Sequence, residues 1–384
     1  MTSALIVDAV RTARGKAKET GALHALRPVE LVAALLDALA ERNRLDLAAL
    51  DDLVLGCVTQ VGDQGANVAR TAAAFAGLPR VSGVTINRAC ASGLDAIHHA
   101  ALLVEAGRAD LVVAGGVESM SRVPMFADQG AMFADPEVAR RTDFIHMGIA
   151  ADALATRADL PRAALDAYAL DSHRRAADAH RRGATARSLV PVAGVARDEL
   201  FREDLTAEKL AALAPAFGDL PRPAAMGVVD ARHTVATSPG MCDGAALVLL
   251  ASEAAARRLG LQPRARVAGG AGACVEPLVM LTGNVDATAI LLARAGLEAR
   301  DVDLFEINES FAAVPLHYAR HFEIPRDRVA PDGGALSLGH PLGATGGYLV
   351  TALVDGLEAR GGRRGVATVC GAAGVATALL IERA

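Results

Sequence analysis

Short β-rich apolar runs alternate with helical patterns in two separate stretches of the chain. This alternation is typical of sheets buried beneath helices, so it predicts an α/β fold. The first stretch predicts elements at Ala4–Val10, Val29–Arg42, Leu53–Cys57, Val84–Ile86, Gly93–Gly107 and Leu111–Ala114. The second predicts elements at Ala287–Ala295, Leu304–Ile307, Thr345–Ala359, Val366–Cys370 and Thr377–Ile381.

The two stretches also resemble each other. The segment around Asp52 is similar to the segment around Asp303, which corresponds to an offset of 251 positions. The same offset brings Cys90 to the neighbourhood of His340, and both residues open a glycine-containing segment that runs into a predicted helix. The pattern favours an internal duplication, although βαβ units can also look alike by chance.

Between the two stretches the strand signals fade and arginines become frequent. We interpret this region as an inserted, mainly helical and loop domain. We expect an N-terminal half formed by residues 1–118 and 241–262, the inserted domain at 119–240, and a C-terminal half at 263–384. The arginines either form a solvated helix surface or meet a phosphate-rich ligand. They are Arg174, Arg175, Arg181, Arg182 and Arg187.

Charge and composition exclude several classes of function. The net charge is −5, aromatic residues make up 3% and tryptophan is absent, so neither a basic field nor stacking platforms for nucleic acid are expected. No stretch is expected to provide the roughly 18 apolar residues of a membrane span. The N-terminus resembles a first strand rather than a signal peptide.

The cysteines indicate the redox setting. The chain has five, without Cys-x-x-Cys spacing, so we expect neither a disulfide framework nor a zinc site. A cytoplasmic location is the natural interpretation, in which a cysteine is either packing or a reactive thiolate. No cluster of histidine and carboxylate residues has the spacing of metal ligands, so no metal is expected.

Cys90 lies between a predicted strand and a predicted helix, in the segment Ile86–Leu94. A sharp turn there would place the thiol beside the unpaired N–H groups at the start of the helix, which favour its thiolate. The arrangement resembles a nucleophile elbow with sulfur in place of oxygen. The alternative is a small hydrophobic residue in the core.

His340 lies in the glycine-rich segment Gly333–Gly346. So much glycine implies close backbone approach and little freedom for the imidazole. A histidine next to a cysteine can take its proton and leave a thiolate–imidazolium pair. A phosphate-cradling loop is the alternative, but neither the Gly-Lys-Ser/Thr ending nor a Gly-x-Gly-x-x-Gly pattern is present.

Two further polar positions follow predicted strands. Cys370 ends a strand and precedes a turn whose N–H groups could form an oxyanion hole. Asn308 and Glu309 follow the strand Leu304–Ile307, where polar side chains often face a site. Packing for Cys370 and turn capping for Asn308 are the alternatives.

Taken together, these segments resemble the thiolase family over nearly the whole chain. The resemblance implies the thiolase fold, with two similar layered α/β/α/β/α halves and a loop domain inserted in the first. It also implies an acyltransferase that cleaves 3-oxoacyl-CoA with CoA, or runs the reverse condensation, by a ping-pong mechanism. The segments are Asp8–Thr12, Asn87–Gly93, Gly115–Ser121, His146–Gly148, Asp243–Ala246, Asn308–Ala312 and the His340 segment.

The resemblance also implies roles for individual residues. Cys90 matches the acyl-accepting nucleophile, His340 the histidine that activates it, and Cys370 the acid and base. Asn308 matches the residue that holds a water in the oxyanion hole of the thioester enolate, to which His340 also contributes. The N–H groups of Cys90 and Ala372 would form the second hole.

The same resemblance implies CoA and acyl-CoA as substrates, no permanently bound cofactor, a homodimer or homotetramer, and a place in fatty acid metabolism and β-oxidation. Matching contact positions for CoA or the acyl group are Arg202, His146, Met147, Ser238 and Phe311. Pro239 stands where relatives often have a serine, which affects one expected CoA contact. A related condensing enzyme and a non-catalytic acyl-CoA-binding subunit are the competing hypotheses.

Overall fold

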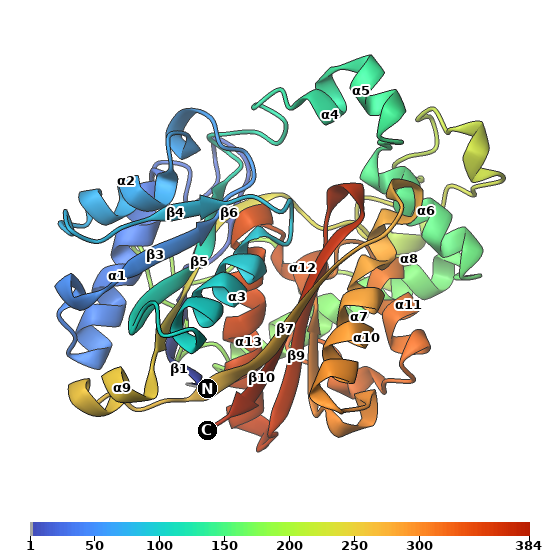
Figure 1. Cartoon of the computed structure of the whole chain (residues 1–384). Helices are drawn as coiled ribbons and strands as arrows, with labels where there is room; N and C mark the ends of the chain where they lie inside the picture. The colour runs from blue at the N-terminus through green and yellow to red at the C-terminus, as the bar shows by residue number, and fades with distance from the viewer. Residues whose placement is uncertain (1–2) are drawn as a thin grey trace.

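The computed structural model describes residues 3–384. Its strands form one mixed sheet in the order β4-β3-β5-β6-β1-β7-β10-β9-β8, and β2 pairs with β6 (Figure 1). The strands are β1 (Ala4–Arg11), β2 (Gly15–Lys16), β3 (Asp52–Gly56), β4 (Val84–Ile86), β5 (Leu111–Ser119), β6 (Cys242–Ala251), β7 (Ala265–Cys274), β8 (Leu304–Ile307), β9 (Arg364–Cys370) and β10 (Val375–Arg383).

The topology repeats on either side of the central β1–β7 pair. On one side β1 pairs antiparallel with β6, β6 antiparallel with β5, and β5 parallel with β3. On the other side β7 pairs antiparallel with β10, β10 antiparallel with β9, and β9 parallel with β8. The chain orders β1-α1-β3-α3-β5-β6 and β7-α10-β8-α13-β9-β10 correspond, as the predicted duplication requires. The helices are α1 (Pro28–Asn43), α3 (Ser92–Glu105), α10 (Gly283–Ala295) and α13 (Thr345–Arg360).

Alternating side chains along each strand divide the core into layers. Leu53 and Leu55 of β3 pack with α1, whereas Val54 packs with α3 and α13. In the other half Val366 of β9 packs with α10, and Ala367 packs with α3 and α13. Strands alternate the direction of successive side chains, so each half-sheet is covered on both faces. The result is an α/β/α/β/α arrangement with α3 and α13 enclosed in the middle.

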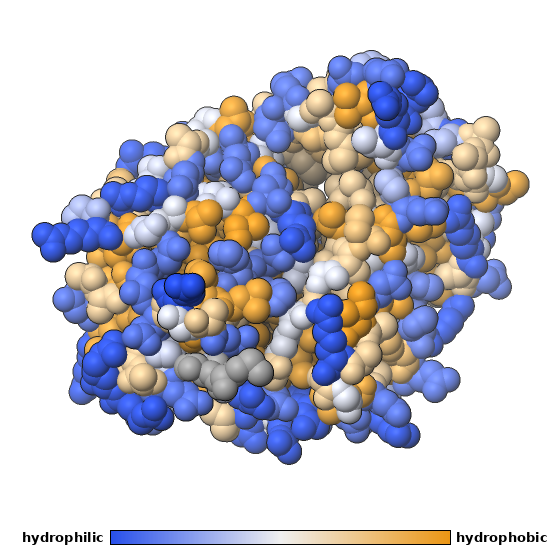
Figure 2. Space-filling view, in the orientation of Figure 1, coloured by the Kyte–Doolittle hydropathy of each residue, from blue (hydrophilic) through white to orange (hydrophobic). Residues whose placement is uncertain are grey.

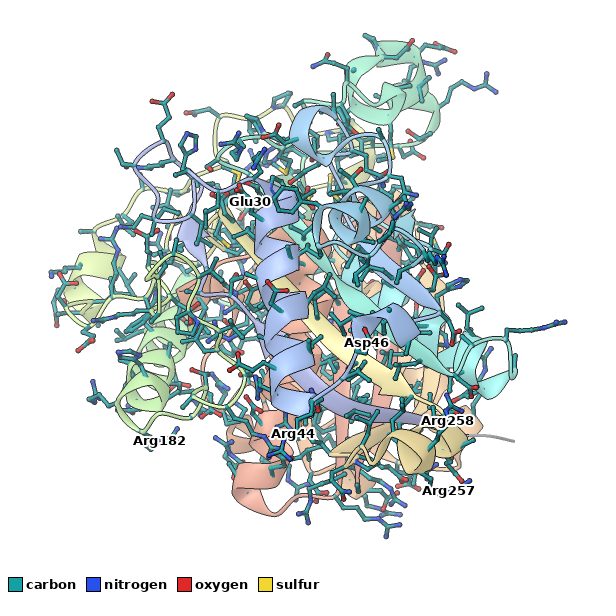
Figure 3. The ribbon with its side chains drawn as sticks, turned by 90° about the vertical axis from the view of Figure 1, so that its left-hand side faces the viewer. Glu30, Arg44, Asp46, Arg182, Arg257 and Arg258 are labelled. Carbon is teal, nitrogen blue, oxygen red and sulfur yellow. The ribbon has the colours of Figure 1, made fainter. Side chains whose placement is uncertain are left out.

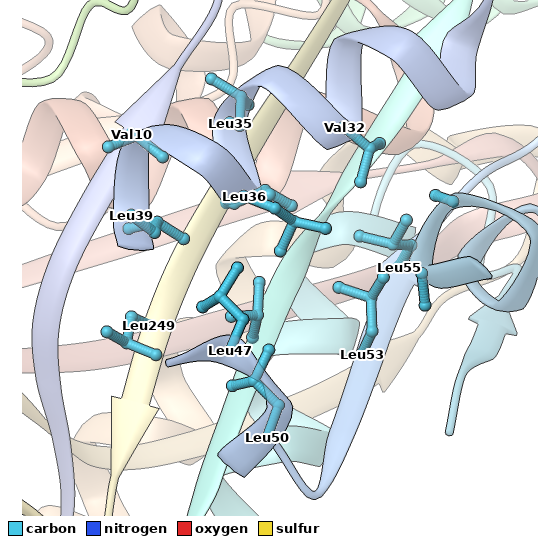
Figure 4. Packing of buried hydrophobic residues seen from close by; sticks show 14 of the residues in the cluster. Val10, Val32, Leu35, Leu36, Leu39, Leu47, Leu50, Leu53, Leu55 and Leu249 are labelled. Carbon is cyan, nitrogen blue, oxygen red and sulfur yellow. The ribbon is translucent and has the colours of Figure 1, made fainter. Parts of the chain in front are cut away.

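Helix α1 illustrates how the outer layers form. Its leucines recur at helical spacing and meet the strands below it, where Leu36 and Leu39 are buried near Leu249 of β6 (Figure 4). Each buried leucine contributes about 1.5–3 kcal/mol relative to exposure. The helix begins two residues before Glu30 and ends at Asn43, and the following Arg44 is in the left-handed conformation (φ 50°) (Figure 3).

The remaining outer elements are short. Helix α2 covers β3 and β4, α9 lies beside β6, and α11 covers β8 from the α10 side. Their bounds are α2 (Val68–Phe75), α9 (Glu253–Leu259), α11 (Ala313–His321) and α12 (Ala335–Leu338), with 3-10 turns at η1 (Leu47–Ala49), η2 (Gly62–Gln64), η4 (Pro277–Thr282), η5 (Ala299–Asp301), η6 (Arg326–Arg328), η7 (Leu342–Ala344) and η8 (Ala372–Gly374).

Residues between β5 and β6 form helices and loops on one side of the sheet (Figure 1). The elements are α4 (Ala131–Ala134), α5 (Pro136–Arg141), α6 (Met147–Arg157), α7 (Arg162–Arg181), α8 (Ala207–Ala211) and η3 (Ala224–Met226). Each arginine singled out in this region pairs with a carboxylate of the chain itself, which favours the solvated-surface interpretation. The pairs are Arg174–Asp171, Arg175–Asp171, Arg181–Asp178, Arg182–Asp332 and Arg187–Glu358.

Several predicted bounds need correction. The strand predicted at Leu111–Ala114 continues to Ser119, and the helix predicted from Ala287 begins at Gly283. Strands β6 and β7 were not among the predicted elements. Contrary to the sequence expectation, Pro277–Ala295 has the length and apolar composition of a membrane-spanning helix. Half of it is buried, and α10 packs against β7 and β10 as a core helix does.

Candidate active site

Cys90 lies on a tight turn between β4 and α3. The residue before it, Ala89, has a positive φ of 47°, which is unfavourable for a residue with a side chain. Ser92 holds the turn, because its hydroxyl accepts from the Arg88 N–H at 2.8 Å and donates to the Ala89 carbonyl at 2.5 Å. The turn therefore has the strained strand-to-helix geometry expected of a nucleophile elbow.

The first turns of α3 and α13 are in direct backbone contact. A methyl group added to Gly346 of α13 would lie 1.9 Å from the backbone nitrogen of Leu94 in α3. Only glycine permits such an approach. Cys90 precedes one helix and His340 the other, so the contact brings the two segments together at the positive ends of both helix dipoles.

Two hydrogen bonds to neighbouring residues fix the position of His340. Its backbone N–H donates to the Gly240 carbonyl at 2.9 Å, and its Nδ1 lies 2.6 Å from the Thr345 hydroxyl oxygen. Nε2 is buried and has no hydrogen-bond partner among residues 3–384. Burial, and then the charge of Arg14, lower the His340 pKa to about 4. The ring is therefore neutral near pH 7, with Nε2 available to accept a proton.

Cys370 and Asn308 are connected through Ser310. The Ser310 hydroxyl lies 3.5 Å from Cys370 Sγ and accepts from the Asn308 side-chain amide at 2.8 Å. The amide oxygen of Asn308 is buried without a partner among the described residues. Burial raises the pKa of Cys370 to about 11, while the hydrogen bond with Ser310 acts to lower it.

One cavity of about 210 Å³ brings the chemical groups together. Cys90 and His340 line it from two loops and Cys370 from the end of β9, together with Ser310. The rest of its wall is mainly apolar. It consists of Met120, Met125, His146, Met147, Phe217, Ser238, Pro239, Gly240, Met241, Leu281, Phe311, Leu342, Gly371 and Ala372. A concave apolar site with a few convergent polar groups is typical of a ligand-binding or active site.

The resting Cys90 side chain is a neutral thiol. Burial, followed by the charges of Cys370 and Glu118, raises the pKa of Cys90 to about 12. Hydrogen bonds from the backbone N–H groups of Cys90 and Ala372 act in the opposite direction. Burial therefore opposes the helix end that was expected to favour the thiolate, and it favours a neutral Cys90 thiol and a neutral His340 imidazole.

Comparison with known proteins identifies the family. Residues 4–254 match the model described as "Thiolase, N-terminal domain", and residues 261–383 match "Thiolase, C-terminal domain". The chain belongs to the thiolase family. It is therefore a CoA-dependent acyltransferase, as the sequence resemblance implied.

Individual thiolases resemble the chain over its full length. It is 40% identical over 412 residues to the 3-oxoadipyl-CoA/3-oxo-5,6-dehydrosuberyl-CoA thiolase of Escherichia coli strain K12. This match covers 100% of both chains. A steroid 3-ketoacyl-CoA thiolase of Mycobacterium tuberculosis is 37% identical, covering 100% of this chain and 95% of that protein. The crystal structure of the Bacillus anthracis acetyl-CoA acetyltransferase has a TM-score of 0.90 and 35% identity, covering 100% of this chain and 99% of the other.

The thiolase cavity contains most of the residues expected at the site. His146, Met147, Ser238, Phe311 and Ala372 line it beside the two cysteines and His340. Asn308 is buried behind Ser310 and is not part of the wall. The structure does not bring Arg202 to this cavity. Arg202 lines a separate surface hollow beside α7, where its backbone N–H donates to His173 at 3.0 Å.

The sequence reasoning assigned no individual role to several residues of the site. Ser310 bridges Asn308 and Cys370, and its position two residues after Asn308 could have indicated it. Thr345, five residues after His340, orients the imidazole from the first turn of α13. Met125 gives no signal in the sequence, because its place in the wall depends on the path of the loop after β5.

Proposed function

We propose that this thiolase cleaves 3-oxoacyl-CoA with free CoA through an acyl group carried on Cys90. One observation carries the proposal: Cys90, His340 and Cys370 face a single apolar cavity. The backbone N–H groups of Cys90 and Ala372 also act to lower the pKa of Cys90. A nucleophile, a neutral base, a second acid and an oxyanion hole are the groups that this carbon–carbon cleavage requires.

In the first half-reaction, His340 Nε2 takes the Cys90 proton as the sulfur attacks the 3-oxo carbon. The new oxyanion lies between the N–H groups of Cys90 and Ala372. Collapse of this intermediate breaks the bond between C2 and C3 and leaves the acyl group on Cys90. The bonding electrons form the acetyl-CoA enolate, whose oxygen is stabilised by His340 and by a water that Asn308 would hold, and Cys370 protonates C2.

In the second half-reaction, the Cys370 thiolate takes the proton of the incoming CoA thiol. The CoA sulfur attacks the acyl carbon on Cys90, and the same two N–H groups hold the oxyanion again. Collapse releases the shortened acyl-CoA, and the Cys90 sulfur recovers its proton from His340. In reverse, Cys370 removes the α-proton of acetyl-CoA, for which the hydrogen bond from Ser310 stabilises its thiolate.

The proposal extends to the surroundings of the reaction. His146, Met147, Ser238 and Phe311 would contact CoA or the acyl group, and Arg202 would contact the nucleotide end of CoA outside the cavity. We propose the domain division 1–118 with 241–262, 119–240 and 263–384. We further propose a cytoplasmic homodimer or homotetramer that acts in β-oxidation of fatty acids, without a permanently bound cofactor.

The test is CoA-dependent cleavage of acetoacetyl-CoA and of a longer 3-oxoacyl-CoA, measured as loss of the 3-oxo thioester. Cys90→Ala should lower kcat by at least about 1,000-fold, whereas Cys274→Ala, at an exposed cysteine, should not. Mass spectrometry after incubation with acetyl-CoA should find one acetyl group on Cys90. An acetyl group on another cysteine, or turnover by Cys90→Ala, would refute the proposed nucleophile.

A further inference from the structure

The wall of the cavity around Cys90 is apolar where an acyl chain would leave the sulfur. Met120, Met125, Leu281, Phe311 and Leu342 lie on this wall. The hydroxyl of Ser310 is already engaged with Asn308 and Cys370. The wall therefore offers contact area for methylene groups rather than polar partners.

A second hollow of about 340 Å³ adjoins the cavity and shares His146 and Met147 with it. Three phenylalanines line this hollow. The rings of Phe126 and Phe133 are 4.4 Å apart, and those of Phe133 and Phe144 are 6.2 Å apart. Phe133 and Ala134 of α4 line the hollow together with residues of the loops before α4 and after α5. The surface of the molecule in this region is largely hydrophilic, with apolar atoms below it (Figure 2).

Neither hollow contains a cation. Among residues 3–384, no lysine or arginine lines either wall. On the neighbouring loop and helix, Arg122 pairs with Asp63 and Arg140 with Glu137, while Arg141 is exposed and lines neither hollow. His146 adds no charge near neutral pH, because burial lowers its pKa and its Nδ1 accepts the Gly148 N–H at 3.0 Å.

We infer that this thiolase takes acyl groups whose far end is an apolar hydrocarbon, and that it discriminates against acyl groups that end in a carboxylate. The inference rests on the proposed function. A carboxylate that is buried without a cation or several N–H donors loses its hydrating water. It then gains no interaction that compensates for this loss. The Escherichia coli relative is named for a 3-oxoadipyl thioester, so the inference separates this chain from that relative.

A matched pair of six-carbon substrates tests the discrimination. 3-Oxohexanoyl-CoA and 3-oxoadipyl-CoA differ only in a terminal methyl group against a terminal carboxylate. The methyl compound should have a kcat/KM at least about 100-fold higher. Equal or faster cleavage of the adipyl compound would overturn the inference alone. Failure to cleave either compound or acetoacetyl-CoA would overturn the proposed function, and this inference with it.

A variant of α4 tests whether long chains reach the second hollow. Ala134 lines this hollow and is exposed, so Ala134→Phe fills the hollow at little risk to folding. It should lower kcat/KM about 10-fold for 3-oxododecanoyl-CoA and change that for 3-oxohexanoyl-CoA less than about twofold. Ala131→Phe, exposed on the same helix outside the hollow, is the control. An equal loss for both chain lengths would overturn this placement of the chain.

Discussion

The carboxylate of Glu118 accepts a hydrogen bond from the backbone N–H of Gly343, three residues after His340, at 2.8 Å. The same carboxylate accepts from the N–H groups of Val58 and Thr59, which follow β3, at 2.9 and 3.1 Å. A single buried side chain of the N-terminal half therefore fixes the histidine loop of the C-terminal half. The active site depends on this connection between the two halves.

Replacing Glu118 with glutamine should damage both stability and activity. The amide nitrogen would face backbone N–H donors in a site where Glu118 is fully buried. We expect a loss of about 2–4 kcal/mol in the free energy of unfolding, and a kcat about 10-fold lower because the His340 loop shifts. Urea unfolding and steady-state thiolysis measure the two effects.

Glu137→Gln provides the control for Glu118→Gln. Glu137 lies on α5, is exposed, and pairs with Arg140 one helical turn away. Exposed pairs of this kind contribute little, so the change should stay within about 0.5 kcal/mol. Wild-type stability in Glu118→Gln would show that the carboxylate does not hold the loop.

Gly346→Ala should prevent the normal approach of α13 to α3. Its methyl group would lie 1.9 Å from the Leu94 nitrogen, and the obstacle is backbone rather than a flexible side chain. We expect a loss of more than about 3 kcal/mol, seen as a lower urea midpoint or as insoluble protein. Gly218→Ala, where the nearest atom is Ala231 Cβ at 3.7 Å, should be nearly neutral. Equal effects of the two substitutions would contradict the close helix contact.

Ser310→Ala should slow proton transfer at carbon more than it weakens substrate binding. Without the hydroxyl, Cys370 loses the hydrogen bond that lowers its pKa, and the Asn308 amide loses its acceptor. We expect kcat to fall about 10-fold with little change in KM, and deuterium uptake at the acetyl-CoA methyl group to slow in parallel. Ser310→Thr keeps a hydroxyl and should retain most of the exchange. Unchanged exchange in Ser310→Ala would exclude this role.

Sequence patterns predicted the regular core but missed strands that depend on their neighbours. The run Val84–Ile86 matches β4 because β-branched residues are bounded by turn residues. Strand β7 was missed, because Ala265–Cys274 is mostly alanine and glycine, which have low strand propensity. Its place between β1 and β10 supplies the pairing that its own sequence does not indicate.

The site was predictable to the extent that its residues follow strands or open helices. Cys90, His340 and Cys370 were assigned to one site from their motifs, the internal repeat and the resemblance to thiolases, and they line one cavity. Their neutral resting state was not foreseen, because burial appears only when the halves close around the site. The hydrogen bond between Glu118 and Gly343 spans 225 positions, so no local pattern contains it.

Buried histidines should make the fold sensitive to mild acid. Burial lowers the pKa of His340 to about 4, with Arg14 acting in the same direction, against about 6.5 in an unfolded chain. Because the unfolded state binds the proton first, stability is present above pH 6.5, falls as the pH drops towards 4, and levels off below it. The His340 contribution is about 3 kcal/mol over that window.

Urea unfolding of the wild type and of His340→Gln at several pH values between 7 and 4 measures this contribution. The variant should lose less stability than the wild type over the window, by up to about 3 kcal/mol. His173, whose pKa burial also lowers to about 4, should give the same result when replaced by glutamine. His180→Gln, at an exposed position of α7, is the control for replacing a histidine outside the site. Parallel pH profiles for wild type and His340→Gln would mean that the imidazole is protonated as readily in the folded enzyme as in the unfolded chain. The proposal that a neutral His340 is the base for Cys90 would then be untenable.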